Sequence, residues 1–366
     1  MAFMVICLHV QLFYDNDWSM SGGLFDVFVI YLCKVICPVA VPAFFFFSGY
    51  LFFKKLEDWN SDVWKSKITK RIRTLLVPYL LWNLIAMLAF PITRLGGVIL
   101  NGGDMASFWD VLADRGWIRI FWDRTLFDGN IPNTTNILGW RVPCGQPMNT
   151  PMWFVRDLMV VILFSPIIHW FVKKGRIVFL ALLVAFLAVD IWIPVSGFSI
   201  KSVFFFSWGA YYSINGAYFI ESFRKKRVPV AVLFAIGLAF LPFLMEYNKQ
   251  IFSAGVRMFT IISLMFLVNT VSGILREREP KVRTKLAQSS FFVYCSHMVI
   301  IISAVMWVVM ALPFHSGIMQ TILFIVGSFL VYAICHCLFL FMNKFMPKML
   351  AVLTGGRVVA DKTSDK

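Results

Sequence analysis

Two apolar stretches and the basic segment between them decide the fold. The apolar stretches are PVAVPAFFFFSGYLFF (residues 38–53) and IRTLLVPYLLWN (residues 72–83). Residues 54–73 carry seven lysines and arginines between two segments that are apolar enough to enter a membrane. Short loops rich in Lys and Arg stay on the cytoplasmic side of a membrane. We therefore predict a helix–loop–helix unit whose loop faces the cytoplasm. The direction of every other helix follows from this unit.

The composition of the whole chain is that of a membrane protein. Of its 366 residues, 60% are hydrophobic and only 14% are charged, and the mean hydropathy is +0.78. A soluble domain would carry about 25% charged residues. Apolar runs of about 20 residues, the length that spans a bilayer, recur along the chain. The fold class predicted is therefore all-α, a polytopic membrane protein whose surroundings are the lipid bilayer.

The net charge of +15 does not indicate a nucleic-acid-binding protein. The basic residues lie in short segments between apolar ones, where they set topology and attract anionic lipid headgroups. A nucleic-acid-binding domain gathers its cations on one face instead. Six of the seven cysteines fall in apolar segments, so we predict neither a disulfide framework nor a metal site.

The hydrophobic pattern predicts ten transmembrane helices. They are expected at about residues 1–13, 24–53, 72–93, 151–171, 177–195, 202–219, 229–245, 251–275, 286–312 and 317–342. The segments assigned to the cytoplasm carry 24 Lys and Arg, against 7 on the opposite side, which places both termini in the cytoplasm. We expect one transmembrane domain at residues 1–345, an outer loop at about 94–150 with a short amphipathic helix near 108–127, and a cytoplasmic tail at 346–366.

The first apolar segment is shorter than a bilayer requires. Its 13 residues rise about 20 Å, against about 30 Å of hydrocarbon. It has neither the basic start nor the small-residue cleavage site of a signal peptide. The expectation is that this helix is cut at its N-terminus.

Charged and imidazole side chains inside predicted membrane helices are the candidate site residues. Such side chains are costly in a bilayer and by default indicate function. We expect six of them near one level of the membrane: His9, Lys34, Arg156, Asp157, Arg257 and His297. The alternative is a set of separate structural contacts, with Arg156 paired to a carboxylate such as Asp26 and His297 bonded to a backbone carbonyl. His9 is the leading candidate for catalysis, because a neutral imidazole accepts a proton near pH 7.

Five tryptophans crowd the predicted outer loop and its exit: Trp109, Trp117, Trp122, Trp140 and Trp153. Packing at the membrane interface explains most of them. Stacking of a carbohydrate on one or two of these rings, Trp153 among them, is the alternative.

Several ordered motifs resemble acyltransferase family 3, the bacterial multi-helix O-acyltransferases that modify surface polysaccharides and lipids. These motifs are VICLH (residues 5–9), PAFFFFSGY (42–50), KRIR followed by PY (70–73 and 78–79), MWFVRD (152–157) and FVYCSH (292–297). The resemblance extends over nearly the whole chain. In the family a basic residue precedes the first-helix histidine by eleven positions, a place that falls before Met1 here. No hydrolase-like domain follows the last helix, as in stand-alone members.

The resemblance implies an enzyme that moves an acyl group, most simply acetyl, from cytoplasmic acyl-CoA to a hydroxyl of a cell-surface glycan or lipid-linked saccharide. His9 would act as general base on that hydroxyl or carry the acyl group transiently, and His297 is a second catalytic candidate. Arg156 or Arg257 would orient the donor carbonyl or stabilise its oxyanion. The expected location is the bacterial inner membrane.

Acyl-CoA is expected as a donor substrate, with no permanently bound cofactor. Lys70, Arg71 and Arg73 are the candidate ligands for its phosphates. Lys34, Asp157, Arg257 and Trp153 are expected to contact substrate or form a charge network.

The alternative function is a membrane transporter or flippase for a glycan or lipid intermediate, which would use the same buried charges as a relay. Broken helices and inverted repeats would favour this alternative, and the sequence shows neither clearly.

Overall fold

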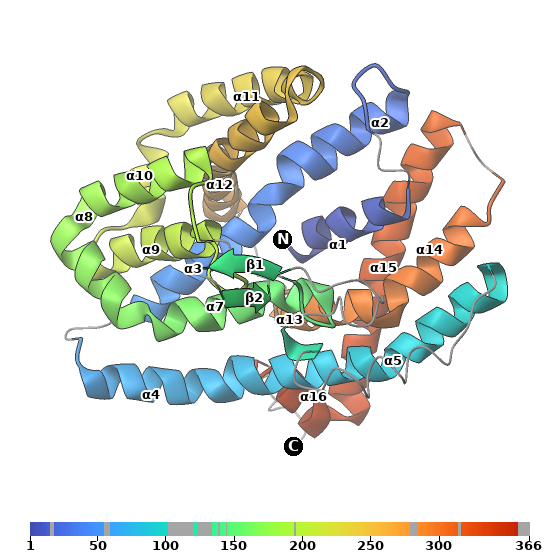
Figure 1. The fold of residues 1–366 in the computed structure, drawn as a ribbon, viewed down its shortest axis with the longest axis horizontal. Coiled ribbons are helices and arrows are strands. Elements are labelled where there is room, and N and C mark those ends of the chain that lie inside the picture. Colours follow the sequence, from blue (N-terminus) through green and yellow to red (C-terminus); the bar gives the residue numbers. More distant parts are fainter. Residues whose placement is uncertain are drawn as a thin grey trace.

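The computed structural model describes residues 1–14, 18–54, 59–101, 120–122, 134–137, 140–143, 145–193, 195–278, 284–313 and 316–357. These residues are helical or irregular except for one short antiparallel hairpin, formed by β1 (Thr134–Ile137) and β2 (Trp140–Pro143) (Figure 1). The hairpin lies in the predicted outer loop and was not expected. The predicted amphipathic helix near 108–127 falls mostly outside the described residues. The helical fold class is confirmed.

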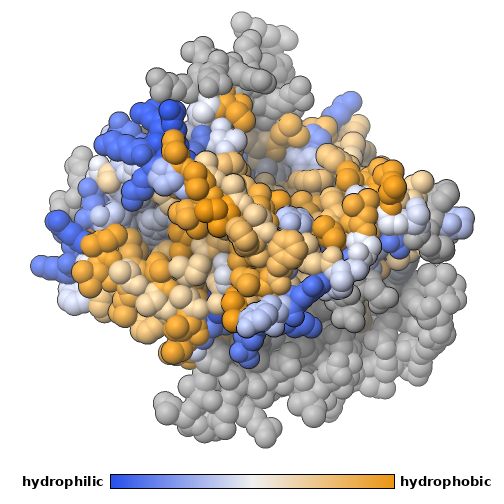
Figure 2. Space-filling view, turned by 90° about the horizontal axis from the view of Figure 1, so that it is seen from above, coloured by the Kyte–Doolittle hydropathy of each residue, from blue (hydrophilic) through white to orange (hydrophobic). Residues whose placement is uncertain are grey.

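Within the described residues, six helical segments are long and apolar enough to cross a membrane. They are Leu24–Phe53, Ser61–Phe90, Arg227–Tyr247, Lys249–Leu275, Leu286–Met310 and Gly317–Phe345. A broad hydrophobic area crosses the face seen in Figure 2, and hydrophilic residues gather mostly at its margins. The chain is therefore a multi-pass membrane protein. The count of ten helices and the cytoplasmic position of both termini stay predictions.

The N-terminal half begins with a short helix and one long broken one. Their parts are α1 (Ala2–Val10), η1 (Gln11–Phe13), α2 (Leu24–Val29), a π-helical segment (Ile30–Ile36), η3 (Cys37–Val39) and α3 (Ala40–Phe53). The chain then runs through α4 (Ser61–Arg71), a second π-helical segment (Ile72–Leu76) and α5 (Val77–Asn101). In Figure 1, α4 and α5 form one long line of helix along one side of the molecule.

The prediction of a basic loop up to Arg73 was wrong, because most of that segment is helix. The side chain of Asn60 caps α4 by accepting hydrogen bonds from the backbone N–H groups of Asp62 and Val63. An asparagine cap favours helix formation, and the lysines and arginines that follow are good helix formers. The third helix therefore starts near residue 61 rather than residue 72.

The C-terminal half carries the remaining elements. They are η7 (Thr150–Met152), α7 (Trp153–Leu163), α8 (Ser165–Val189), α9 (Ile200–Ile214), α10 (Phe219–Arg224), α11 (Arg227–Tyr247), α12 (Lys249–Arg278), α13 (Thr284–Ser296), a π-helical segment (His297–Ile301), α14 (Ile302–Met310), α15 (Gly317–Phe345) and α16 (Pro347–Leu353). Helix α8 is kinked at Arg176, whose φ of 44° interrupts the helical backbone. This kink falls where the sequence predicted a loop between two spans.

The three π-helical segments each carry a candidate site residue. Lys34 lies in the first, Arg73 in the second and His297 begins the third. A π turn adds a residue to an α-helix and occurs frequently at functional sites, because it redirects side chains that a regular helix would bury elsewhere. The π-helical backbone therefore supports Lys34, Arg73 and His297 as candidate site residues.

The segment expected as the start of a tail packs against the helical body as far as Arg357. Leu350 and Leu353 of α16 are buried, and the indole N–H of Trp82 on α5 donates a 3.0 Å hydrogen bond to the carbonyl oxygen of Leu353. Residues 358–366 lie outside the described range. The domain boundary at residue 345 stays a prediction.

Replacing Trp82 with Phe is expected to lower the free energy of unfolding by about 1 kcal/mol, because it removes this buried hydrogen bond while keeping an aromatic ring. Trp64→Phe is the matched control: its indole N–H is buried and has no partner among the described residues. That change should be neutral or slightly stabilising. Thermal unfolding of the purified protein in detergent measures both, and equal losses in the two variants would contradict the assignment.

Candidate active site

The imidazole rings of His9 and His297 lie together where α1 meets the start of the third π segment. Their ring centroids are 5.3 Å apart, and the planes are tilted by 46°. His297 is fully buried, whereas His9 is half-buried. The two histidines lie 288 residues apart in the 366-residue sequence, so the tertiary fold brings them together. His9 is therefore the more accessible ring of the pair.

The hydrogen bond of His297 defines the chemistry of its second nitrogen. Nδ1 lies 3.1 Å from the backbone carbonyl oxygen of Val293. A carbonyl only accepts, so Nδ1 carries the proton in the neutral ring and Nε2 keeps a free lone pair. Nε2 is buried and has no hydrogen-bond partner among the described residues. The backbone contact predicted for a purely structural His297 is therefore present, and it leaves Nε2 as a hydrogen-bond acceptor.

A buried chain of amide groups fixes the backbone next to His297. Asn83 on α5 donates to the carbonyl oxygen of Tyr79 and accepts from the backbone N–H of Asn149, at 2.8 and 2.9 Å. The side chain of Asn149 donates a 2.8 Å hydrogen bond to the carbonyl oxygen of Cys295. Sequence reasoning missed both asparagines. Asn83 could have been noticed as a polar amide within an apolar helix. Such a group is costly in a bilayer unless it is hydrogen-bonded, so its presence indicates a partner.

Replacing Asn83 with Leu is expected to lower the free energy of unfolding by about 1–3 kcal/mol, because it leaves the buried N–H of Asn149 without an acceptor. Asn215→Leu is the control, since Asn215 makes the same bond to the residue four positions earlier (Tyr211) but is exposed. We expect a loss of at most about 0.5 kcal/mol there. Unfolding midpoints in detergent test the pair. Equal unfolding midpoints for the two variants would show that the hydrogen bonds of Asn83 do not stabilise the site.

Arg156 and Asp157 form a buried ion pair at the start of α7. The Nε and Nη2 groups of Arg156 donate to Oδ1 of Asp157 at 3.2 and 3.1 Å, and Nη1 donates to the carbonyl oxygens of Trp122 and Gly145. The prediction that Arg156 pairs with Asp26 was wrong, because its partner is Asp157, the next residue in the chain. These contacts anchor residues 122 and 145 to the helix body. A role of Arg156 in orienting the donor carbonyl stays a prediction.

Lys34, Arg257 and Trp153 line a cavity of about 320 Å³. Leu8, the residue before His9, also lines it. The guanidinium of Arg257 donates hydrogen bonds to the carbonyl oxygens of Leu187 and Ala188 at the end of α8. It also forms an ion pair with Asp190. The expected network residues therefore divide into two groups: the Arg156–Asp157 pair and this cavity.

The three basic residues expected to hold the donor phosphates do not share one surface. Arg71 is half-buried beside the ring of Phe52 and lines an apolar groove between α4 and α7, whereas Arg73 faces Gly355 and Gly356. Lys70 is exposed. Arg357, which sequence reasoning missed, stacks on Phe291 with its guanidinium carbon 3.8 Å from the ring centroid. Burial, and to a lesser extent the nearby charge of Arg71, lower the pKa of Arg357.

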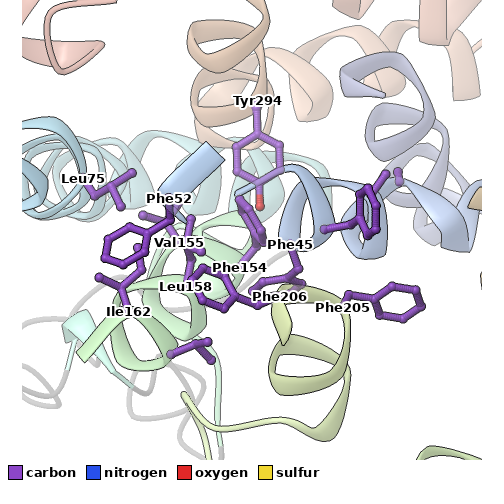
Figure 3. Packing of buried hydrophobic residues seen from close by; sticks show 14 of the residues in the cluster. Phe45, Phe52, Leu75, Phe154, Val155, Leu158, Ile162, Phe205, Phe206 and Tyr294 are labelled. Carbon is purple, nitrogen blue, oxygen red and sulfur yellow. The ribbon is translucent and has the colours of Figure 1, made fainter. Parts of the chain in front are cut away.

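A pocket of about 240 Å³ connects Arg357 with the neighbourhood of His297. It is lined mainly by apolar side chains of α3, α7 and α13, with Ser48 and Tyr294 among them. Tyr294 donates a hydrogen bond to the carbonyl oxygen of Pro151, and its ring centroid lies 6.3 Å from that of His297. Figure 3 shows the Tyr294 ring extending from α13, with its hydroxyl oxygen directed toward the aromatic cluster that includes Phe154. The pocket lining therefore includes one cation, Arg357, and the ring of Tyr294, which lies near His297.

Together these features define a multi-pass membrane protein in which a half-buried and a buried imidazole lie side by side. The family model described as an acyltransferase domain matches residues 1–346, so the chain belongs to acyltransferase family 3 and is an acyltransferase. The chain is similar to the succinoglycan biosynthesis protein ExoH of Rhizobium meliloti (strain 1021), with 26% identity over 98% of this chain and 90% of the relative. No solved structure matches the chain. The resemblance identified from the sequence motifs is confirmed.

Proposed function

We propose that this protein transfers an acyl group, most simply acetyl, from acyl-CoA to a hydroxyl of a cell-surface glycan or lipid-linked saccharide. The single observation that carries the proposal is the pairing of His9 with His297, whose ring centroids are 5.3 Å apart. The similarity to a succinoglycan biosynthesis protein supports a saccharide acceptor. Donor delivery from the cytoplasm and location in the bacterial inner membrane are parts of the same proposal.

In the proposed reaction His9 takes the proton from the acceptor hydroxyl as its oxygen attacks the thioester carbonyl. A carbon–oxygen bond forms, the carbon–sulfur bond breaks, and the departing thiolate of CoA receives that proton from His9. A base positioned in this way contributes about 10²–10⁴-fold in rate. The free lone pair on Nε2 of His297 would accept a hydrogen bond from the His9 ring, which orients the ring and stabilises its charged form.

The pocket between α3, α7 and α13 is the proposed path of the donor. Its lining includes Arg357, near Arg71, and guanidinium groups bind phosphate oxygens well because they offer paired N–H donors. Its apolar lining suits the uncharged arm of CoA, and one lining residue, Tyr294, lies near His297. Among the three basic residues expected from the sequence, Arg71 is the one that this arrangement favours.

Purified full-length protein in detergent, supplied with radiolabelled acetyl-CoA, tests the proposal through release of free CoA and transfer of label to added cell-envelope saccharides. We expect release that depends on His9 and that increases when an acceptor is present. Arg357→Gln should raise the KM for acetyl-CoA several-fold with little change in kcat. Saccharide transport by the protein reconstituted into sealed vesicles, without any CoA release, would instead support the transporter alternative.

A further inference from the structure

The cavity beside α1 gathers three cations that the proposed chemistry does not use. Lys34 from the first π segment, Lys201 near the start of α9 and Arg257 from α12 all line its wall. The cavity measures about 320 Å³, at the small end of the range of about 300–1,000 Å³ for ligand sites. It therefore has room for one sugar residue that carries a small anionic group.

The positive charge of this cavity is incompletely balanced by the protein. Arg257 has an ion pair with Asp190, 3.2 Å away, and that carboxylate is exposed. In the part of the chain that the structure describes, neither Lys34 nor Lys201 has a carboxylate within 4.0 Å. Lys34 is half-buried in an otherwise apolar segment, a position that is costly for an ammonium group without a counter-charge. An anion bound in the cavity would supply that counter-charge.

The rest of the lining suits a sugar ring that carries the anion. Trp153 contributes an aromatic ring to the wall, and most other lining side chains are apolar. The hydroxyl of Ser253 accepts a hydrogen bond from Arg257, and that of Thr260 donates one to the Arg257 carbonyl oxygen, so both hold Arg257 in the wall. Leu8 belongs to the wall and directly precedes His9, so a ligand here lies beside the helix that carries the proposed base. The donor pocket has no lining residue in common with this cavity. This cavity therefore suits the acyl acceptor rather than the acyl donor.

We propose that this cavity binds an oxyanion group of the acyl acceptor, so that the acceptor is an acidic saccharide rather than a neutral one. The shared chemistry is a carboxylate or phosphate held by two lysines and an arginine. Its source is either a sugar acid or a phosphate on a lipid-linked sugar. The statement that the bound anion belongs to the acyl acceptor rests on the proposed function. The statement that the cavity binds an anion does not.

Binding is measured on the full-length protein in uncharged detergent through the rise of its thermal unfolding midpoint with ligand concentration. The probes are methyl glucuronoside, glucose 1-phosphate and methyl glucoside at constant ionic strength. The first two should stabilise the protein and the neutral glycoside should not. Stabilisation by the glucuronoside alone identifies a carboxylate site, and stabilisation by the phosphate alone identifies a phosphate site.

Lys34→Gln is expected to weaken binding of the anionic probe about tenfold, as expected for loss of one charged hydrogen bond. Lys34→Arg should restore it, which separates charge from folding. Lys249→Gln, an exposed cation on the same helix as Arg257, is the control and should bind as wild type. Equal stabilisation by the neutral glycoside, no binding of either anionic probe, or equal effects at Lys34 and Lys249 would overturn the inference. None of these measurements needs acyl-CoA, so loss of CoA release without loss of anion binding would count against the proposed function alone.

Discussion

Replacing His9 with Ala is expected to lower the rate of acyl transfer by about 10²–10⁴-fold, the contribution of a positioned general base. His9 is the half-buried member of the imidazole pair, so it is the one that an acceptor hydroxyl can approach. Its loss removes the proton acceptor and leaves the binding surfaces in place. We expect the change in kcat, with KM for acetyl-CoA nearly unchanged, in the assay of CoA release.

The control for this variant is His336→Ala. His336 is also a half-buried histidine in a membrane-spanning helix, but its Nδ1 pairs with the hydroxyl of Ser289 at 3.0 Å. That variant should retain wild-type turnover. Both proteins should elute as single species of wild-type size, which separates catalysis from folding. Wild-type turnover in His9→Ala would remove His9 from the mechanism and leave His297 as the base to test.

The helical spans could be predicted from the sequence because apolar length is a local property. The segments expected at residues 24–53 and 317–342, for example, agree with the observed spans Leu24–Phe53 and Gly317–Phe345 to within three residues. The basic segment before Ile72 was misassigned as a loop. Charge density indicates the side of a membrane, but it does not distinguish a loop from a capped polar helix such as α4.

The candidate site was only partly predictable for a different reason. His9 and His297 each stood out alone as polar residues in apolar segments, but their contact depends on the packing of α1 against α13. The amide chain from Asn83 to Cys295 and the position of Arg357 depend equally on tertiary structure. No local pattern encodes the π turns that carry Lys34 and His297. The sequence therefore indicated the chemical groups but not which of them meet.

The close approach of α3 and α9 holds the centre of the helical body together. Gly49 and Gly209 face each other's helices: a Cβ at Gly49 would overlap the backbone oxygen of Phe206, and one at Gly209 would overlap that of Phe46. The hydroxyl of Ser213 donates a 2.6 Å hydrogen bond to the carbonyl oxygen of Tyr50 across the same interface. Small residues let membrane helices approach in this way, where packing rather than hydrophobicity drives association.

Gly209→Ala is therefore expected to lower the free energy of unfolding by more than about 3 kcal/mol, beyond the usual cost of overpacking. The obstacle is a backbone oxygen rather than a flexible side chain, so the two helices must separate and lose contacts along their length. Gly273→Ala on α12 is the matched control, because nothing lies within 4 Å of a Cβ there. Alanine's higher helix propensity should leave that variant unchanged or stabilise it by up to about 1 kcal/mol. Unfolding midpoints in detergent decide the comparison, and a Gly209→Ala protein as stable as wild type would mean that α3 and α9 do not pack at backbone contact.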